Sequence, residues 1–349
     1  MTGTGIDLVG LRKQFGVTTA VDGLNLEVAA GSLAALLGPS GCGKSSTLAM
    51  INGLLDPDAG DVRLDGRSVL GTPAQRRPIA TVFQKPLLFP HLDVWHNVAF
   101  GLRMRRVERR QLRRRVDLAL DQVQLTGLAH RRVGELSGGQ EQRVSLARAL
   151  VLEPRVFLLD EPFSQLDAAL RAEMRSLVRQ LHDLSDVTTL FVTHDQGEAV
   201  DIADTVALMM DGTLAGHGSP EMFYRRPPSL AAARFFGVTN EVPGDVVGDT
   251  FLSRANRLVR ADVGVAAGPA VLVVRPEALR LASTAGPDAV GGMLMGARFA
   301  GTHTAVDVAL DNGGTLQVLC PVGDSLQVGA RVYVEVPPAS CTIFPLAQS

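Results

Sequence analysis

The chain has 349 residues, a formal charge of −2 and 46% hydrophobic residues. This length exceeds one average domain and predicts two, each with enough apolar residues for a core. The near-neutral charge excludes the bulk basic character that is typical of nucleic-acid-binding proteins.

Three cysteines, Cys42, Cys320 and Cys341, are an odd number and lie far apart in the sequence. They do not form a disulfide framework, so a reducing cytoplasm is the simpler interpretation. The first sixteen residues lack a charged segment followed by an apolar one, and we expect no signal peptide. No stretch reaches the roughly 18 apolar residues that span a bilayer. If the protein acts at a membrane, it would therefore do so through a partner protein.

In chain order, residues 31–54 predict a strand, a glycine turn and a helix. Residues 85–150 favour an inserted, mainly helical subdomain. Two short apolar strands follow at 155–162 and 188–195, with a helical pattern at 168–184 between them. Strands that alternate with helices indicate a parallel sheet covered by helices, which is an α/β fold.

The pattern changes after about residue 240. The short runs AVLVVRP, TAVDVAL, TLQVLCP and RVYVEVP are rich in β-branched residues and are separated by Gly, Pro and Asp. We expect an all-β module there, a small barrel, with the domain boundary near 237–240.

The first glycine turn, GPSGCGKSS, fits the P-loop pattern with Gly38, Gly43, Lys44 and Ser45 at the required spacing. Its backbone N–H groups can surround a phosphate, and Lys44 adds a positive charge at the β- and γ-phosphates. The Ser45 hydroxyl can complete the oxygen shell of Mg²⁺. A chance match in an ordinary strand-to-helix turn is the alternative.

Two carboxylates, Asp160 and Glu161, end the strand VFLLDE. Asp160 could hold Mg²⁺ through water, and Glu161 is a candidate general base for the attacking water. The alternative is a helix-capping aspartate followed by a solvated glutamate.

A second glycine turn begins the helix that follows Ser137, within ELSGGQEQR. Ser137 and Gln140 match a capping box, which is one interpretation of this turn. A cap does not require Gly138 and Gly139, however, and glycines without β-carbons allow another surface to approach the backbone. The other interpretation is a two-fold dimer in which this turn covers a nucleotide bound to the partner's first turn.

The segments GPSGCGKS, VFQ, LSGGQEQR, VFLLDEP, SQLD and VTHD, in this order, closely resemble the ATP-binding-cassette (ABC) ATPases over roughly residues 5–235. The resemblance implies a P-loop ATPase domain over 1–237, with the helical subdomain at about 85–150, and ATP and Mg²⁺ as ligands. Gln165 and Ser46 are mild departures from the family pattern.

The resemblance also implies a role for individual residues. ATP contacts are expected from Phe15, Gly38, Pro39, Ser40, Gly41, Cys42, Gly43, Lys44, Ser45 and Ser46. Mg²⁺ ligands are expected at Ser45, Gln84 and Asp160. The implied catalytic residues are Glu161, His194 and Gln84. The implied contacts to the partner's ATP are Ser137, Gly138, Gly139 and Gln140, with Asp167 at the dimer interface. For Phe15, packing in the core remains the alternative to stacking on adenine.

Three further features keep two interpretations each. Leu87, Leu88, Phe89 and Trp95 either fill the helical subdomain or line the groove that, in the family, receives a helix of the membrane subunit. The run Arg103–Arg115 is a solvated helix face by default, with contact to lipid phosphates as the minor option. Cys42 is either a small spacer or a thiol whose pKa is lowered at a helix N-terminus.

The tail, 238–349, resembles the OB-like (TOBE) accessory domain of importer ATPases, through FFGVTNEVPGDV and VLVVRPEALRL. This group imports polyamines, iron, thiamine, sulfate or molybdate, with sugars less favoured here. The implied protein is a peripheral ATPase on the cytoplasmic face, working as two copies with permease subunits and an extracytoplasmic binding protein. The alternatives are a soluble cassette ATPase acting on nucleic acid or ribosomes, and a tail that senses a small ligand. Few aromatic and basic residues in the tail disfavour nucleic acid.

Overall fold

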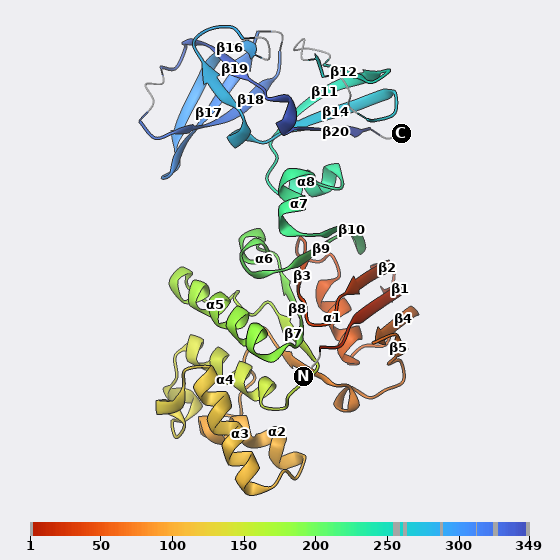
Figure 1. Ribbon diagram of the computed structural model, residues 1–349, viewed down its shortest axis with the longest axis vertical. Coiled ribbons are helices and arrows are strands. Elements are labelled where there is room, and N and C mark those ends of the chain that lie inside the picture. Colours follow the sequence, from red (N-terminus) through yellow and green to blue (C-terminus); the bar gives the residue numbers. More distant parts are fainter. Residues whose placement is uncertain are drawn as a thin grey trace. The chain divides into compact units, whose positions relative to one another are not determined.

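The computed structural model describes residues 3–253, 259–260, 264–286, 289–311, 313–323 and 327–346. The chain divides into two compact units, Met1–Pro220 and Glu221–Ser349 (Figure 1). We call them the first and the second unit.

Two sheets form the first unit. The antiparallel sheet has the order β2-β1-β4-β5, and the second sheet has the order β10-β9-β3-β8-β7-β6. In the second sheet all neighbours are parallel except β9 and β10. The strands are β1 (Ile6–Phe15), β2 (Thr18–Val28), β3 (Leu33–Leu37), β4 (Ala59–Leu64), β5 (Arg67–Ser68), β6 (Ile79–Val82), β7 (Val156–Asp160), β8 (Thr188–Thr193), β9 (Thr205–Met210) and β10 (Thr213–Gly218).

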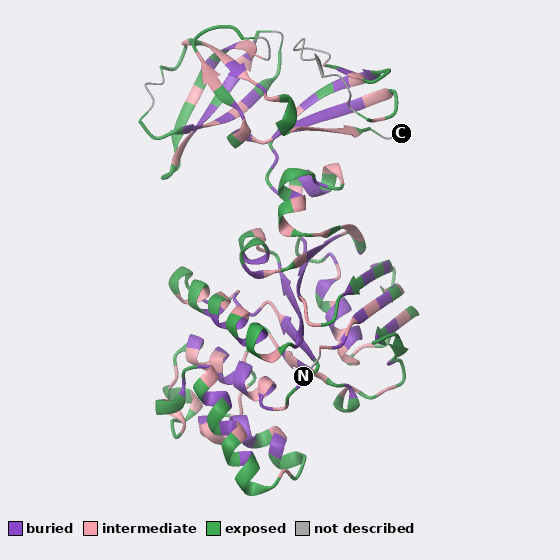
Figure 2. Ribbon diagram, in the orientation of Figure 1, coloured by how far each residue is buried: buried purple, intermediate pink, exposed green. Residues whose placement is uncertain are grey.

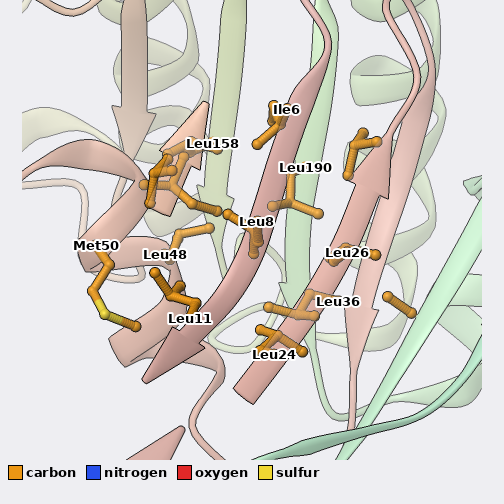
Figure 3. Packing of buried hydrophobic residues seen from close by; sticks show 14 of the residues in the cluster. Ile6, Leu8, Leu11, Leu24, Leu26, Leu36, Leu48, Met50, Leu158 and Leu190 are labelled. Carbon is orange, nitrogen blue, oxygen red and sulfur yellow. The ribbon is translucent and has the colours of Figure 1, made fainter. Parts of the chain in front are cut away.

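The central strands β3 and β8 are buried along their whole length. Their near-continuous apolar runs are typical of parallel strands that are covered on both faces. On one face, a core joins the antiparallel sheet, the first helix and the parallel sheet (Figure 3). Leu8 of β1, Leu48 of the helix and Leu190 of β8 all belong to this core.

Six α-helices lie within the described residues of the first unit: α1 (Lys44–Asn52), α2 (Val94–Met104), α3 (Arg109–Gln122), α4 (Gly138–Leu150), α5 (Ala168–Ser185) and α6 (Gln196–Ile202). The helices α2, α3 and α4 pack on one another through buried side chains such as Val98, Val116 and Val144. They occupy the segment that the sequence predicts to be a helical subdomain, and α5 occupies the segment predicted to be a helix.

The second unit carries two five-stranded sheets, in the orders β13-β12-β11-β14-β20 and β15-β19-β16-β17-β18. Both sheets contribute to a single core that includes Phe251 and Leu272 from the first and Val306 and Val318 from the second. The strands are β11 (Asn240–Val247), β12 (Thr250–Ser253), β13 (Val259–Arg260), β14 (Gly268–Val274), β15 (Arg280–Ala282), β16 (Ala289–Phe299), β17 (His303–Leu310), β18 (Thr315–Pro321), β19 (Arg331–Glu335) and β20 (Cys341–Pro345). The expected all-β module is therefore two sheets around one core.

The first unit ends at Pro220, which is earlier than the expected division between residues 237 and 238. The reason is that two short helices, α7 (Pro220–Arg225) and α8 (Leu230–Phe235), pack on the β-strands of the second unit. Ala233 packs against Val271 and Val273 of β14. The Arg275 guanidinium donates to the carbonyl oxygens of Tyr224 (2.9 Å) and Phe236 (2.6 Å).

Asn240, at the start of β11, joins the two sheets of the second unit. Its side chain is 1% exposed. It donates to the Gln317 carbonyl at 2.8 Å and accepts from the Gln317 N–H at 2.7 Å.

We expect Asn240→Ala to lower the free energy of unfolding by about 2 kcal/mol, because it leaves both backbone groups without their partner. Denaturant unfolding of the full chain measures this. A loss below about 0.5 kcal/mol would contradict the assigned role.

Candidate functional site

The carboxyl ends of β3, β8, β7 and β6 meet at one edge of the parallel sheet. The residues that follow these ends are Gly38, His194, Glu161 and, two residues after β6, Gln84. Ligands of α/β sheets bind outside the carboxyl ends of the strands. Residues that are separated by more than a hundred positions in the sequence are thereby collected at one place.

The first glycine turn requires its glycines for two reasons. The backbone φ values of Gly38, Gly41 and Gly43 are 156°, 84° and 99°, which residues other than glycine rarely adopt. A β-carbon on Gly43 would lie 2.2 Å from the Ala20 carbonyl oxygen, and one on Gly38 would lie 2.2 Å from that of Met209. The turn is therefore packed closely on β2 and β9.

Lys44 lies under this turn and is 5% exposed. Its ammonium donates to the carbonyl oxygens of Gly38 and Pro39, both at 2.8 Å. Cys42 is 4% exposed, and burial raises the pKa of its thiol even though Lys44 acts in the opposite direction. The structure does not support the alternative of a lowered pKa, because desolvation outweighs the effect of Lys44. The structure thus favours Cys42 as a small packed residue.

The hydroxyl of Ser45 lies within hydrogen-bonding reach of the Asp160 carboxylate. Burial raises the pKa of Asp160, and the neighbouring Glu161 carboxylate acts in the same direction. A nearby cation would reverse this effect by favouring the ionised form. A hydroxyl and a carboxylate are hard oxygen donors, the type that Mg²⁺ prefers, so these side chains fit that ion.

Glu161 brings Gln84 and His194 together. Its carboxylate accepts from the Gln84 amide at 3.2 Å and lies 3.3 Å from the His194 Nδ1. Its backbone has φ 42°, an uncommon conformation for a residue other than glycine, and its N–H donates to the Val192 carbonyl at 3.2 Å. Backbone strain of this kind is concentrated at functional sites, where the surrounding structure compensates for it.

Phe15 ends β1 and is 50% exposed. This exposure is inconsistent with the alternative that the ring fills the core. The Lys13 ammonium lies 5.7 Å from the ring centroid. The ring is available as a flat surface for stacking.

The second glycine turn is a capping box. Ser137 Oγ accepts from the Gln140 N–H at 3.4 Å, and Gln140 Oε1 accepts from the Ser137 N–H at 3.0 Å. The two glycines differ. A β-carbon on the buried Gly139 would lie 2.4 Å from a methyl carbon of Leu170, whereas one on Gly138 would have no atom within 4 Å among the described residues. Packing within the chain explains Gly139 but not Gly138.

Asp167 is the N-cap of α5, and its carboxylate accepts from the Leu170 N–H at 2.9 Å. Leu170 is also the residue that packs on Gly139. The second glycine turn and the Asp167 turn are therefore adjacent, although the sequence separates them by about 30 positions. Asp167 and Gly138 are both exposed.

Ser164 and Arg148 make contacts at the site that were not expected from the sequence. Ser164 Oγ accepts from the Gln84 amide at 3.1 Å and donates to the Glu161 carbonyl at 3.0 Å. Arg148, on α4, donates to the carbonyl oxygens of Leu87 (2.8 Å) and Pro86 (3.1 Å). Ser164 could have been found from its position directly after the DEPF segment. Arg148 has no local signal, because its partners lie about 60 residues away.

Comparison with known proteins shows the family of this chain. Residues 21–164 match the ABC transporter family, and residues 272–344 match the TOBE domain family. The Fe(3+) ions import ATP-binding protein FbpC of Vibrio cholerae is 39% identical over 345 residues, which cover 98% of each chain. The chain belongs to the ABC transporter family. It is an ABC importer ATPase subunit with a TOBE domain.

Other relatives of this ABC subunit differ in the solute that they are named for. FbpC of Photobacterium profundum is 44% identical over 279 residues, covering 79% of each chain. The sulfate/thiosulfate import ATP-binding protein CysA of Bradyrhizobium diazoefficiens is 42% identical over 335 residues, covering 95% of this chain and 97% of its own.

A solved structure is also similar. It is cbiO1 of Clostridium perfringens, part of the ABC transporter complex cbiONQ, with a TM-score of 0.60 and 31% identity. The match covers 64% of this ABC subunit and 91% of cbiO1. Within the part of the chain that the structure describes, no helix is long and apolar enough to cross a membrane.

Glu198 of this ABC subunit is a buried carboxylate, four residues after His194, that the sequence did not reveal. It accepts a hydrogen bond from the Thr193 hydroxyl, and its N–H donates to Asp195 at 3.2 Å. Burial raises the pKa of Glu198 above its usual 4.5, against the hydrogen bond from Thr193 and the charges of Arg171 and Arg175.

A raised pKa in the folded state means that ionisation of Glu198 opposes folding. Its contribution to stability is complete below its unfolded pKa and is lost as the pH rises through the folded value. We expect Glu198→Gln, which keeps an acceptor for Thr193, to gain stability relative to the parent as the pH rises above about 4.5, the ordinary pKa of a glutamate. Thermal unfolding across this range measures the difference. A difference that is constant with pH would contradict the raised pKa.

Proposed function

We propose that this chain is the energy-coupling subunit of a binding-protein-dependent importer, in which two copies act on the cytoplasmic face of permease subunits. The ATP-binding domain would comprise 1–237, with its helical subdomain at about 85–150, and the accessory domain 238–349. The observation that carries the proposal is the cluster of Gln84, Glu161 and His194 beside the Gly38–Ser45 turn.

In this proposal Glu161 is the general base. Its carboxylate lies at the sheet edge, within hydrogen-bonding reach of two polar side chains that can orient it. A positioned base that takes a proton from the attacking water contributes about 10²–10⁴-fold to the rate. Gln84 and His194 would contact the water and the γ-phosphate from either side of the carboxylate. Ser164 would position both Gln84 and Glu161.

The residues of the first glycine turn would bind ATP. Backbone N–H groups of the turn and the N-terminus of α1 favour the phosphates, and Lys44 provides the positive charge next to them. The exposed Phe15 ring would stack on the adenine. Mg²⁺ would be held by Ser45 and Asp160, with Gln84 as a further oxygen donor, and it would neutralise phosphate charge when bound.

The second glycine turn would contact the ATP of a second copy. Ser137 and Gly138 are exposed, and Gly138 has no internal packing reason to lack a side chain. Asp167, exposed beside this turn, would lie in the same dimer interface. The two copies would therefore form two shared ATP sites.

Coupling to the permease would use the segment after Gln84. Leu87 in this segment is 61% exposed and has φ 44°. Arg148 fixes the segment to α4, the helix that begins at the second glycine turn. A movement of Gln84 or of α4 on ATP binding would thus shift the face on which a permease helix docks.

The solute would be a small ion, with ferric iron and sulfate or thiosulfate as the leading candidates, because FbpC and CysA relatives are named for these solutes. Polyamines, thiamine and molybdate are less supported, and sugars least. The relatives named as importers disfavour the alternative of a soluble ATPase acting on nucleic acid or ribosomes.

We expect ATPase activity of the assembled complex to be stimulated by a binding protein loaded with Fe³⁺ or sulfate. Stimulation by a sugar-loaded binding protein alone would contradict this choice.

Glu161→Gln tests the proposed base. We expect steady ATP hydrolysis to fall by a factor of about a hundred or more, while ATP binding persists, because the amide cannot accept the proton. Phosphate release and nucleotide binding measure the two properties. Glu173→Gln, which changes an exposed carboxylate on α5, is the matched control and should hydrolyse ATP at the parent rate. Hydrolysis by Glu161→Gln at the parent rate would remove Glu161 from this role.

Gly138→Leu tests the partner contact. Since nothing lies within 4 Å of its added β-carbon, we expect the folded chain and its ATP binding to be unaffected. The larger side chain should nevertheless reduce ATP-driven dimerisation by about tenfold or more, because it occupies the approach to the other copy. Light scattering with ATP measures this. Gly127→Leu, at another open glycine of the same subdomain, should dimerise normally. Normal dimerisation of both variants would leave the second turn as a helix cap only.

A further inference from the structure

The segment from Arg103 to Arg115 has an unusual concentration of charge. It contains eight arginines and one glutamate, a net charge of +7 within a chain whose formal charge is −2. Seven of these arginines are exposed, and only Arg115 is partly buried. In Figure 2 the outer face of α3 is drawn as exposed.

Most of these guanidinium groups make no hydrogen bond or ion pair with another described residue. Arg105 donates to the Leu152 carbonyl, Arg113 faces Asp117, and Arg115 pairs with Glu153. Five others have no hydrogen-bond or ion-pair partner for the side chain among the described residues. These five, which we call the arginine surface, are Arg103, Arg106, Arg109, Arg110 and Arg114.

Helix stability does not explain the arginine surface. Arg109 and Arg110 are the first two residues of α3, where the helix dipole disfavours positive charge. The i,i+4 pairs Arg109 with Arg113 and Arg110 with Arg114 bring like charges together, which also destabilises a helix. A local arrangement that opposes the stability of its own element is typical of a functional surface.

Arg103 of the arginine surface lies on a face of α2 that adjoins the segment we propose for docking the permease. Phe100, Arg103 and Met104 lie on one face of α2, at i, i+3 and i+4. Phe100 contacts Phe89, in the segment after Gln84, with ring centroids 4.5 Å apart. Met104 is 69% exposed. This face of α2 thus carries apolar side chains together with the unpaired guanidinium group of Arg103.

We propose that the arginine surface binds the phosphate groups of anionic lipids in the membrane beside the docked permease. The guanidinium fork matches phosphate oxygens in a bidentate manner. Basic residues near an anionic leaflet are attracted to it within about a Debye length, and the exposed Met104 suits the apolar boundary below the headgroups. This location rests on the proposed function, because the permease brings the surface to the bilayer.

Co-sedimentation of the full chain with lipid vesicles tests the proposal. One vesicle type is phosphatidylcholine alone, and the other contains about one quarter phosphatidylglycerol, each at about 100 mM and about 500 mM NaCl. The test variant replaces the five residues of the arginine surface by Gln. The matched control replaces five exposed arginines elsewhere by Gln, namely Arg12, Arg67, Arg76, Arg155 and Arg226. Both variants keep the residues that we place in the ATP site.

We expect the parent and the control to bind phosphatidylglycerol vesicles about tenfold or more tightly than neutral ones, with loss of this preference at high salt. The test variant should bind both vesicle types equally, with unchanged ATPase activity. The proposal is wrong if the test variant keeps the parent's preference, if the parent has none, or if a DNA duplex is bound more tightly than the anionic vesicles. ATPase activity distinguishes the two proposals: vesicle binding without hydrolysis contradicts the proposed function, and hydrolysis without vesicle binding contradicts only the lipid surface.

Discussion

The first unit depends on one constraint, which is that parallel strands place their carboxyl ends at the same sheet edge. The strands β3, β7 and β8 are buried, so their register is fixed by packing. The site residues follow directly from these ends, and Glu161, in a left-handed conformation, turns its carboxylate toward Gln84 and His194. The packing of these strands therefore both stabilises the core and sets the geometry of the site.

Much of this arrangement could be predicted from the sequence. Gly43, Lys44 and Asp160 follow apolar runs of strand length, and the ABC resemblance connected them to Gln84 and His194. Glu198 and Arg148 could not be found in the same way, because tertiary packing sets the burial of Glu198 and the distant partners of Arg148. The two interpretations of Cys42 stayed open for a related reason: local sequence shows the helix N-terminus but not the degree of burial, which raises the pKa of the thiol.

The helix α4 makes a different contact at each end. Its N-terminus is capped by Ser137 and presents the open Gly138, and Arg148 near its C-terminus holds the segment that follows Gln84. Ten helical residues separate these two points by about 15 Å. A contact made at the first turn can therefore reach the proposed docking face through a single rigid element, without a change in the core.

The central claim is that ATP hydrolysis at each site needs residues of two chains. Hydrolysis by mixed variants tests it most directly, with Lys44→Ala removing the positive charge beside the phosphates in one chain and Ser137→Arg blocking the second turn in the other. Each variant alone has no intact shared site and should hydrolyse ATP only at a background rate, although Ser137→Arg still binds ATP as a single chain. Their mixture contains dimers with one intact site, made from the Lys44 of one chain and the Ser137 of its partner, and should recover hydrolysis. Hydrolysis at the parent rate by Ser137→Arg alone, or none above background in the mixture, would contradict the claim.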